Sequence, residues 1–172
     1  MSKNVSVRTL KFSSIFFSFL IVLNFPALQA SDFIVGIGHD DVLDATDSQS
    51  TAIVLEYHLP EFYQWKDFSF KAATAIHYDT DEDFWIGFGI AADYPLNENW
   101  FLEMSLMPGY YNAGDDGSQL GYDVEFRSLL GFAYILDQDS SLSLSIDHKS
   151  NADLGDENKG SETVSLRYRL RF

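Results

Sequence analysis

From residue 32 to the end of the chain, apolar and polar residues alternate with a period of two in eight stretches, and helical periodicity is almost absent. Segments rich in Gly, Asp, Asn and Pro separate these stretches, as turns do between strands. Strands are predicted at 32–39, 50–59, 67–78, 84–94, 102–110, 122–134, 141–150 and 161–172. Pro60 is expected to end the second. The even number of strands and the lack of a linker predict a single antiparallel domain.

The two faces of these strands differ in a way that indicates where the apolar face lies. One face carries large apolar residues, with aromatic residues near the strand ends. The other carries small residues and charges: Glu56, Lys71, Glu103, Asp123, Glu125, Arg127, Arg167, Arg169 and Arg171. An eight-stranded barrel has a narrow interior that small side chains and Arg–carboxylate pairs can fill. The pattern therefore predicts an all-β fold, an eight-stranded antiparallel transmembrane β-barrel of the outer membrane. The alternative is a soluble lipocalin-like barrel whose apolar face lines a ligand cavity.

The first 30 residues have the features of a signal peptide. Lys3, Arg8 and Lys11 precede the apolar run 15–23, and the small-residue sequence A-L-Q-A ends at Ala30. A transmembrane helix is the alternative, but the run is shorter than the roughly 20 apolar residues that a helix needs to cross a bilayer. We expect residues 31–172 to form the barrel domain after cleavage.

Charge and cysteine content exclude several classes of function. Removal of residues 1–30 takes away three basic and no acidic residues, so the formal charge moves from −15 to −18. This charge argues against nucleic-acid binding, which needs clustered Lys and Arg. The chain has no Cys, and so has neither disulfides nor thiolate metal ligands.

The last two predicted strands carry the candidate chemistry. Counting outward from Gly155 places His148 opposite Glu162, and opposed residues have Cβ atoms about 5 Å apart. Ser150 follows two residues after His148 on the same face. A serine nucleophile, a histidine base and an orienting carboxylate form a hydrolytic triad. The face is the one predicted to contact lipid, which favours a lipid substrate. The alternative is a polar pair that merely solvates a strand end.

The stretch His148-Lys149-Ser150-Asn151-Ala152, followed by Asn158-Lys159-Gly160 and Glu162, resembles the active-site stretch of the PagL family of outer-membrane lipid A deacylases. The resemblance implies an eight-stranded barrel that hydrolyses the ester-linked acyl chain at position 3 of lipid A. Ser150 would be the nucleophile, His148 the base and Glu162 its partner. Asn158 would donate to the oxyanion, with a backbone N–H near Asp153 as the second donor and Asn151 as a positioning residue. An acidic residue at position 153 departs from the family pattern.

The resemblance also sets the expected partners. We expect lipid A or lipopolysaccharide of the outer leaflet as substrate, a location in the Gram-negative outer membrane, and no cofactor or metal; a homodimer is left open. His58 and His77 face the predicted interior and are interpreted as parts of a polar network. The Asp79–Asp83 segment lacks a complete calcium-loop pattern and is interpreted as a solvated loop. The alternative function is a non-catalytic small barrel for adhesion or envelope integrity, acting through its acidic loops.

Overall fold

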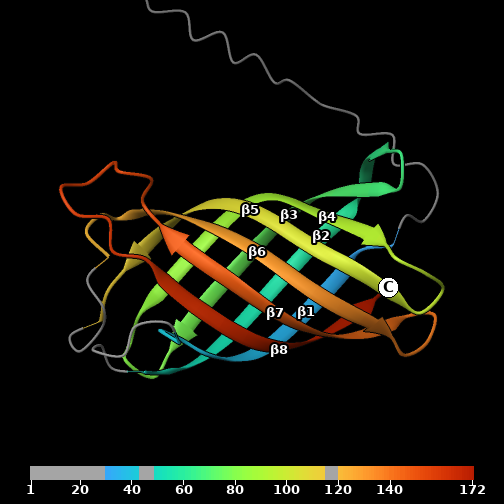
Figure 1. Ribbon diagram of the computed structural model, residues 1–172, viewed down its shortest axis with the longest axis horizontal. Coiled ribbons are helices and arrows are strands. Elements are labelled where there is room, and N and C mark those ends of the chain that lie inside the picture. The colour runs from blue at the N-terminus through green and yellow to red at the C-terminus, as the bar shows by residue number, and fades with distance from the viewer. Residues whose placement is uncertain (1–29, 43–48, 115–119) are drawn as a thin grey trace, which may run out of the picture.

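A computed structural model describes residues 30–42, 49–114 and 120–172, so the predicted signal peptide lies outside it except for Ala30. The described chain forms a closed antiparallel barrel of eight strands, as predicted (Figure 1). The strands are β1 (Asp32–His39), β2 (Thr51–Trp65), β3 (Phe68–Asp79), β4 (Phe84–Pro95), β5 (Trp100–Asn112), β6 (Val124–Ile135), β7 (Ser140–Ser150) and β8 (Ser161–Arg171). Over the described ranges, the chain contains no helix with the length and apolar character required to traverse a bilayer.

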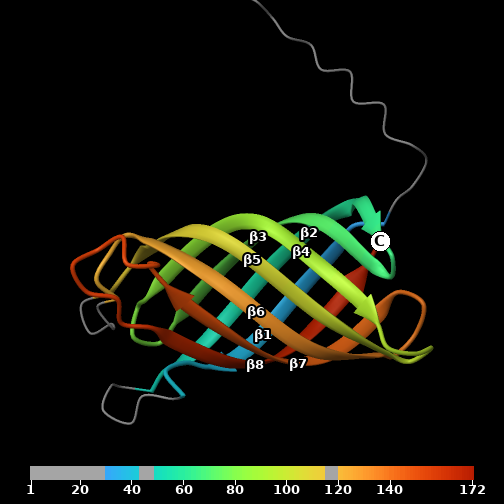
Figure 2. The same cartoon turned by 45° about the horizontal axis from the view of Figure 1, so that its top comes forward.

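Each strand pairs with its neighbours in sequence, and β1 closes the barrel by pairing with β8. The described parts of the connections that follow β1, β3, β5 and β7 lie at one end, which we call the loop end: 40–42, 49–50, 80–83, 113–114, 120–123 and 151–160. The opposite end, the turn end, carries the short connections 66–67, 96–99 and 136–139. The strands cross the barrel obliquely in both views (Figure 2).

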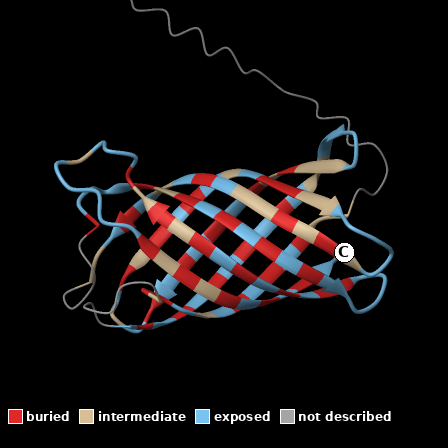
Figure 3. Ribbon diagram, viewed as in Figure 1, coloured by how far each residue is buried: buried red, intermediate tan, exposed pale blue. Residues whose placement is uncertain are grey.

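Burial alternates along the strands and produces a chequered surface (Figure 3). The outward positions are large and apolar; Leu144 in the middle of β7, for example, is 60% exposed. Most inward positions are small, polar or charged, as suits the narrow interior of an eight-stranded barrel, although Trp85, Ile34 and Met107 are also fully buried. The apolar face therefore lies on the outside.

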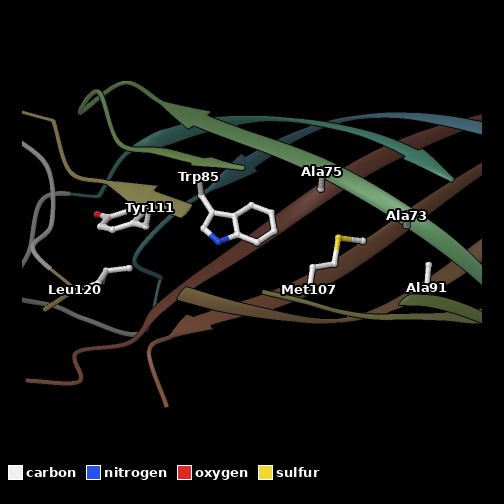
Figure 4. Close-up of a cluster of buried hydrophobic side chains, with 7 residues drawn as sticks. All are labelled: Ala73, Ala75, Trp85, Ala91, Met107, Tyr111 and Leu120. Atoms are coloured by element: carbon white, nitrogen blue, oxygen red, sulfur yellow. The ribbon is translucent and has the colours of Figure 1, made fainter. Parts of the chain in front are cut away.

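The interior contains two kinds of contact. Towards the turn end, buried and partly buried carboxylates form ion pairs with buried cations, such as Arg169 with Asp93 at 2.7 Å and Arg167 with Glu103 at 2.7 Å. Towards the loop end, the indole of Trp85 packs among apolar side chains (Figure 4). The members of this cluster are Ala73, Ala75, Trp85, Ala91, Met107, Tyr111 and Leu120. The indole of Trp85 is thus completely buried in this cluster.

The prediction that Pro60 ends the second strand is wrong, because β2 continues to Trp65. Beyond His58 the strand has no partner in β1, so the N–H that Pro60 lacks is not needed on that side. The pairing of β2 with β3 is irregular between His58 and Tyr63 and absorbs the change of register. Asp123, expected to face the interior, is exposed and precedes β6.

Candidate active site

The structure places His148 directly opposite Glu162 in the β7–β8 ladder, and so confirms the pairing predicted from the hairpin. The imidazole Nδ1 lies 2.8 Å from Oε1 of Glu162. Against an ionised carboxylate, Nδ1 is the donor in this bond, and in a neutral imidazole Nε2 is then an acceptor. The side chains are 44% and 22% exposed, so both are reachable from outside the barrel.

Ser150 is the last residue of β7 and shares the outward face with His148. Residues two apart on a strand are about 6.5–7 Å apart along the backbone, which a serine and an imidazole can span by side-chain rotation. Within residues 30–42, 49–114 and 120–172, no hydrogen bond joins Ser150 to His148. Catalytic hydrogen bonds often tighten only when the substrate binds. The structure thus joins two members of the predicted triad and places the third beside them.

Gly160 belongs to the site, although the sequence marks it only as one residue of the Asn158-Lys159-Gly160 stretch. A Cβ at this position would lie 2.5 Å from Cε1 of His148 and 3.3 Å from its Nδ1. Contacts shorter than 3 Å are not tolerated, so the imidazole can occupy its position only because residue 160 has no side chain. The only feature of the sequence that points to a role for Gly160 is its position directly before β8, the strand that carries Glu162.

A tight turn follows Ser150. Leu154 N donates to Asn151 O at 3.1 Å, and the two central residues have positive φ, 54° at Ala152 and 62° at Asp153. This is the mirror-image geometry that usually takes Gly or Asn. Left-handed backbone at other residues is uncommon and clusters at functional sites, because surrounding contacts must hold it.

Asn158 bridges the two ends of this turn. Its Oδ1 accepts the backbone N–H of Asn151 at 3.0 Å, and its Nδ2 donates to Oδ1 of Asp153 at 3.0 Å. An amide nitrogen has two N–H donors, so one remains for a ligand. The carboxylate of Asp153 therefore lies beside the amide of Asn158.

Asn151, in contrast, points into the barrel and is fully buried. Its Nδ2 donates to the carbonyl oxygens of Leu120 at 3.1 Å and Glu157 at 2.7 Å. It thereby ties the β5–β6 and β7–β8 loops to the end of β7. Asn151 therefore stabilises the β7–β8 loop through these two hydrogen bonds.

The inner face behind the site holds a buried group of Asp40, His77 and Asp79, whose ligand-type atoms lie within 4.8 Å of one another. The ammonium of Lys149 lies 3.1 Å from Asp40 Oδ2 and 3.4 Å from His77 Nε2. Because Lys149 already supplies the positive charge there, this group is better described as an ion-paired network than as a metal centre. Burial raises the pKa of Asp40, beyond the end of β1, but the hydrogen bond from His77 and the charge of Lys149 outweigh burial and hold that pKa below its ordinary value.

The acidic segment after β3 is also engaged in local contacts. Asp79 Oδ1 accepts the backbone N–H groups of Asp81 and Asp83, each at 3.0 Å. Asp83 in turn accepts the hydroxyl of Tyr111 at 2.9 Å and the N–H of Gly114 at 3.0 Å. The interpretation of this segment as a solvated loop is therefore wrong for Asp79 and Asp83, which are 3% and 6% exposed and shape the loop end through these contacts.

The comparison with protein families is decisive for identity. The model of the family described as "Lipid A 3-O-deacylase (PagL)" matches residues 51–171. The chain belongs to this family. The match includes all of the β7–β8 hairpin, and membership supports lipid A 3-O-deacylase activity, a hydrolytic reaction of the outer membrane.

Solved structures agree on the fold. The crystal structure of the outer membrane enzyme PagL is 17% identical, with a TM-score of 0.60 over 81% of this chain and 98% of that one. A de novo designed transmembrane β-barrel is 9% identical, with a TM-score of 0.55 over 84% and 96%. The attachment invasion locus protein Ail of Yersinia pestis is 13% identical, with a TM-score of 0.54 over 84% and 99%. No curated protein sequence matches the chain. This chain, a member of the PagL family, is thus an eight-stranded outer-membrane β-barrel.

Proposed function

We propose that this PagL relative is a serine esterase that removes the ester-linked 3-hydroxyacyl chain at position 3 of lipid A. The observation that carries the proposal is the 2.8 Å bond between His148 Nδ1 and Glu162 Oε1 on the outward face. An oriented imidazole beside a serine is the minimum apparatus for nucleophilic acyl transfer. Because the chain belongs to a family of lipid A 3-O-deacylases, the ester that this serine would attack is the 3-O-acyl ester of lipid A.

The chemistry follows from the position of each group. Ser150 Oγ attacks the ester carbonyl carbon and gives its proton to Nε2 of His148, while Glu162 holds the Nδ1 proton and stabilises the imidazolium. Collapse of the tetrahedral intermediate expels the sugar oxygen, which takes that proton and leaves an acyl-Ser150 ester. Water, deprotonated by His148, then hydrolyses this ester, releases the 3-hydroxy fatty acid and regenerates Ser150.

Oxyanion stabilisation falls to the loop that follows Ser150. The second N–H of Asn158 and the backbone N–H of Asp153 in the tight turn are the proposed donors. The two positive φ values turn this part of the backbone back towards the end of β7. A turn held in strained geometry is consistent with a preorganised donor.

The location of the site on the outer face supports a lipid substrate. Ionisable groups on the lipid-facing side of a barrel cost roughly 2–4 kcal/mol at the bilayer midplane and less at the interface. His148 and Ser150 lie at the loop end of β7, and long loops of such barrels face the exterior. The proposed site therefore lies at the level of the outer leaflet, where lipid A is found.

The experiment that tests the proposal is mass spectrometry of lipid A from cells that produce the wild type, Ser150→Ala or His148→Asn. The wild type is expected to remove one ester-linked 3-hydroxyacyl chain, and both variants to leave lipid A intact. Ser145→Ala is the matched control, because Ser145 lies on the same strand but faces the interior. Equal deacylation by wild type and Ser150→Ala, or none by the wild type, would rule the proposal out.

Export is also part of the proposal. Residues 1–30 are proposed to be removed by a signal peptidase after Ala30, on the sequence pattern alone. N-terminal sequencing of the protein from the outer-membrane fraction is expected to begin at Ser31. A protein that retains Met1 in that fraction would contradict it.

A further inference from the structure

The inner faces of β7 and β8 hold the residues that lie between the members of the proposed triad. Lys149 lies between His148 and Ser150 and points inward, with 1% of its surface exposed. On β8, Ser161 and Thr163 flank Glu162 and are also buried. The outward positions of the triad are therefore set by what these three inward side chains contact.

All three contact a single carboxylate. Asp40, just beyond β1 and 2% exposed, accepts the hydroxyl of Ser161 at 2.9 Å and that of Thr163 at 2.5 Å, both on Oδ1. Its other oxygen, Oδ2, accepts from the ammonium of Lys149 at 3.1 Å. The buried carboxylate of Asp40 thus connects the inward side chains of β7 and β8, the two strands that carry the triad.

Two neighbours restrict the movement of this carboxylate. His77 Nε2 lies 3.3 Å from Asp40 Oδ2, and Asp40 N donates to Ser50 O at 2.9 Å. Further towards the turn end, Arg127 binds Asp147, the inward residue next to His148, at 3.0 Å. In a dry interior such charge-assisted contacts are strong and geometrically specific.

The outward side offers much less support. His148 and Glu162 contact each other, Gly160 lies against the imidazole, and the imidazole is 44% exposed. Their relative placement therefore depends on the relative position of the two strands. A displacement near 1 Å can cost about 100-fold in rate when reacting groups must be aligned.

We infer that Asp40 is a positioning residue of the triad, which fixes β7 against β8 from inside the barrel so that His148 and Glu162 meet outside it. This inference rests on the proposed esterase function for its effect on rate. Its effect on the His148–Glu162 contact does not depend on catalysis.

The test compares Asp40→Asn with Asp93→Asn. Asp93 is a partly buried carboxylate that also pairs with a lysine, Lys71 at 2.8 Å, but it lies towards the turn end. With purified, folded protein in detergent micelles and lipid A as substrate, Asp40→Asn is expected to lower kcat at least tenfold with little change in KM. Asp93→Asn is expected to keep kcat within twofold of the wild type, even where it unfolds more readily.

A second measurement does not require turnover. In protein with ¹⁵N-labelled histidine, the Nδ1 proton of His148 bonded to Glu162 is expected to give a downfield resonance, assigned by its loss in His148→Asn. Asp40→Asn should shift or broaden this signal, and Asp93→Asn should not. Thr163→Val removes only the hydroxyl that donates to Asp40 and keeps every charge. It is expected to lower kcat severalfold and to perturb the same His148 signal. If Asp40→Asn does not fold, Thr163→Val tests the inference in its place.

Unchanged kcat and an unchanged His148 signal in Asp40→Asn, or in Thr163→Val where Asp40→Asn does not fold, would overturn the inference. An equal loss of kcat in Asp93→Asn would also overturn it, because the effect would then be general destabilisation. Failure of the esterase proposal appears separately, as an inactive wild type or an active Ser150→Ala. In that case the resonance of His148 still reports whether Asp40 positions the pair.

Discussion

Gly160 lies against the imidazole of His148 so closely that a Cβ at position 160 would be 2.5 Å from Cε1 of the ring. The ring cannot retreat freely, because its Nδ1 is bonded to Glu162 on the opposite strand. Gly160→Ala should therefore displace the imidazole and lower kcat at least tenfold, while the barrel stays folded. Lipid A deacylation by purified protein measures the loss. Lys159→Ala, an exposed neighbour in the same loop, should keep wild-type activity; equal loss in both would show that any change in the loop suffices.

The carboxylate of Glu162 is expected to fix the imidazole tautomer as well as its position. In Glu162→Gln the side-chain shape is kept, but the amide can donate to Nδ1 and so favours the wrong tautomer. We expect kcat to fall about 10²–10⁴-fold, by analogy with the loss of the carboxylate in other triads. A variant that retains more than half of the wild-type kcat would show that Glu162 is not the orienting group.

The pairing of Asp153 with Asn158 leads to an unusual expectation. A negative charge beside a developing oxyanion opposes catalysis, but the same carboxylate holds the amide of Asn158 at 3.0 Å. Asp153→Asn keeps an acceptor and removes the charge, so kcat should rise about threefold to tenfold. Asp153→Ala removes the acceptor too and should gain less or lose activity. A fall in kcat for Asp153→Asn would show that the charge itself is needed.

The interior ion network should account for much of the stability of the barrel. Glu56 is 2% exposed and accepts from both Arg127 and Arg167 at 2.7 Å. Glu56→Gln removes the carboxylate charge that both guanidinium groups share and leaves Arg127 with Asp147 and Arg167 with Glu103 alone. The loss of this buried negative charge should lower the free energy of unfolding by about 3 kcal/mol. Urea unfolding in detergent micelles measures the difference. Glu157→Gln makes the same chemical change in an exposed ion pair and should leave the unfolding midpoint unchanged.

The lipid-facing assignment of the outer surface can be tested at mid-strand. Leu144 is 60% exposed on the outer face of β7. Leu144→Arg should destabilise the folded barrel in lipid vesicles by about 2–4 kcal/mol. Leu154→Arg in the exposed loop should have no such effect. Equal stabilities of Leu144→Arg and the wild type would mean that this face does not contact lipid.

Much of this architecture could be predicted from the sequence, because side chains alternate between the faces of a strand whatever its partners are. This alternation determined the number of strands, the apolar exterior and the charged interior. The hairpin count from Gly155 also predicted His148 opposite Glu162, because the pairing of adjacent strands is a local property.

Only the tertiary structure decided the contacts that depend on closure of the barrel. Asp40 meets Lys149 across 109 positions of sequence, and no periodicity reports which interior side chains meet. The extension of β2 past Pro60 depended on where β1 ends, and the place of Gly160 depended on the imidazole that lies against it. A strand pattern determines the face on which a side chain lies, whereas its partner is determined by the register of strands brought together when β1 pairs with β8.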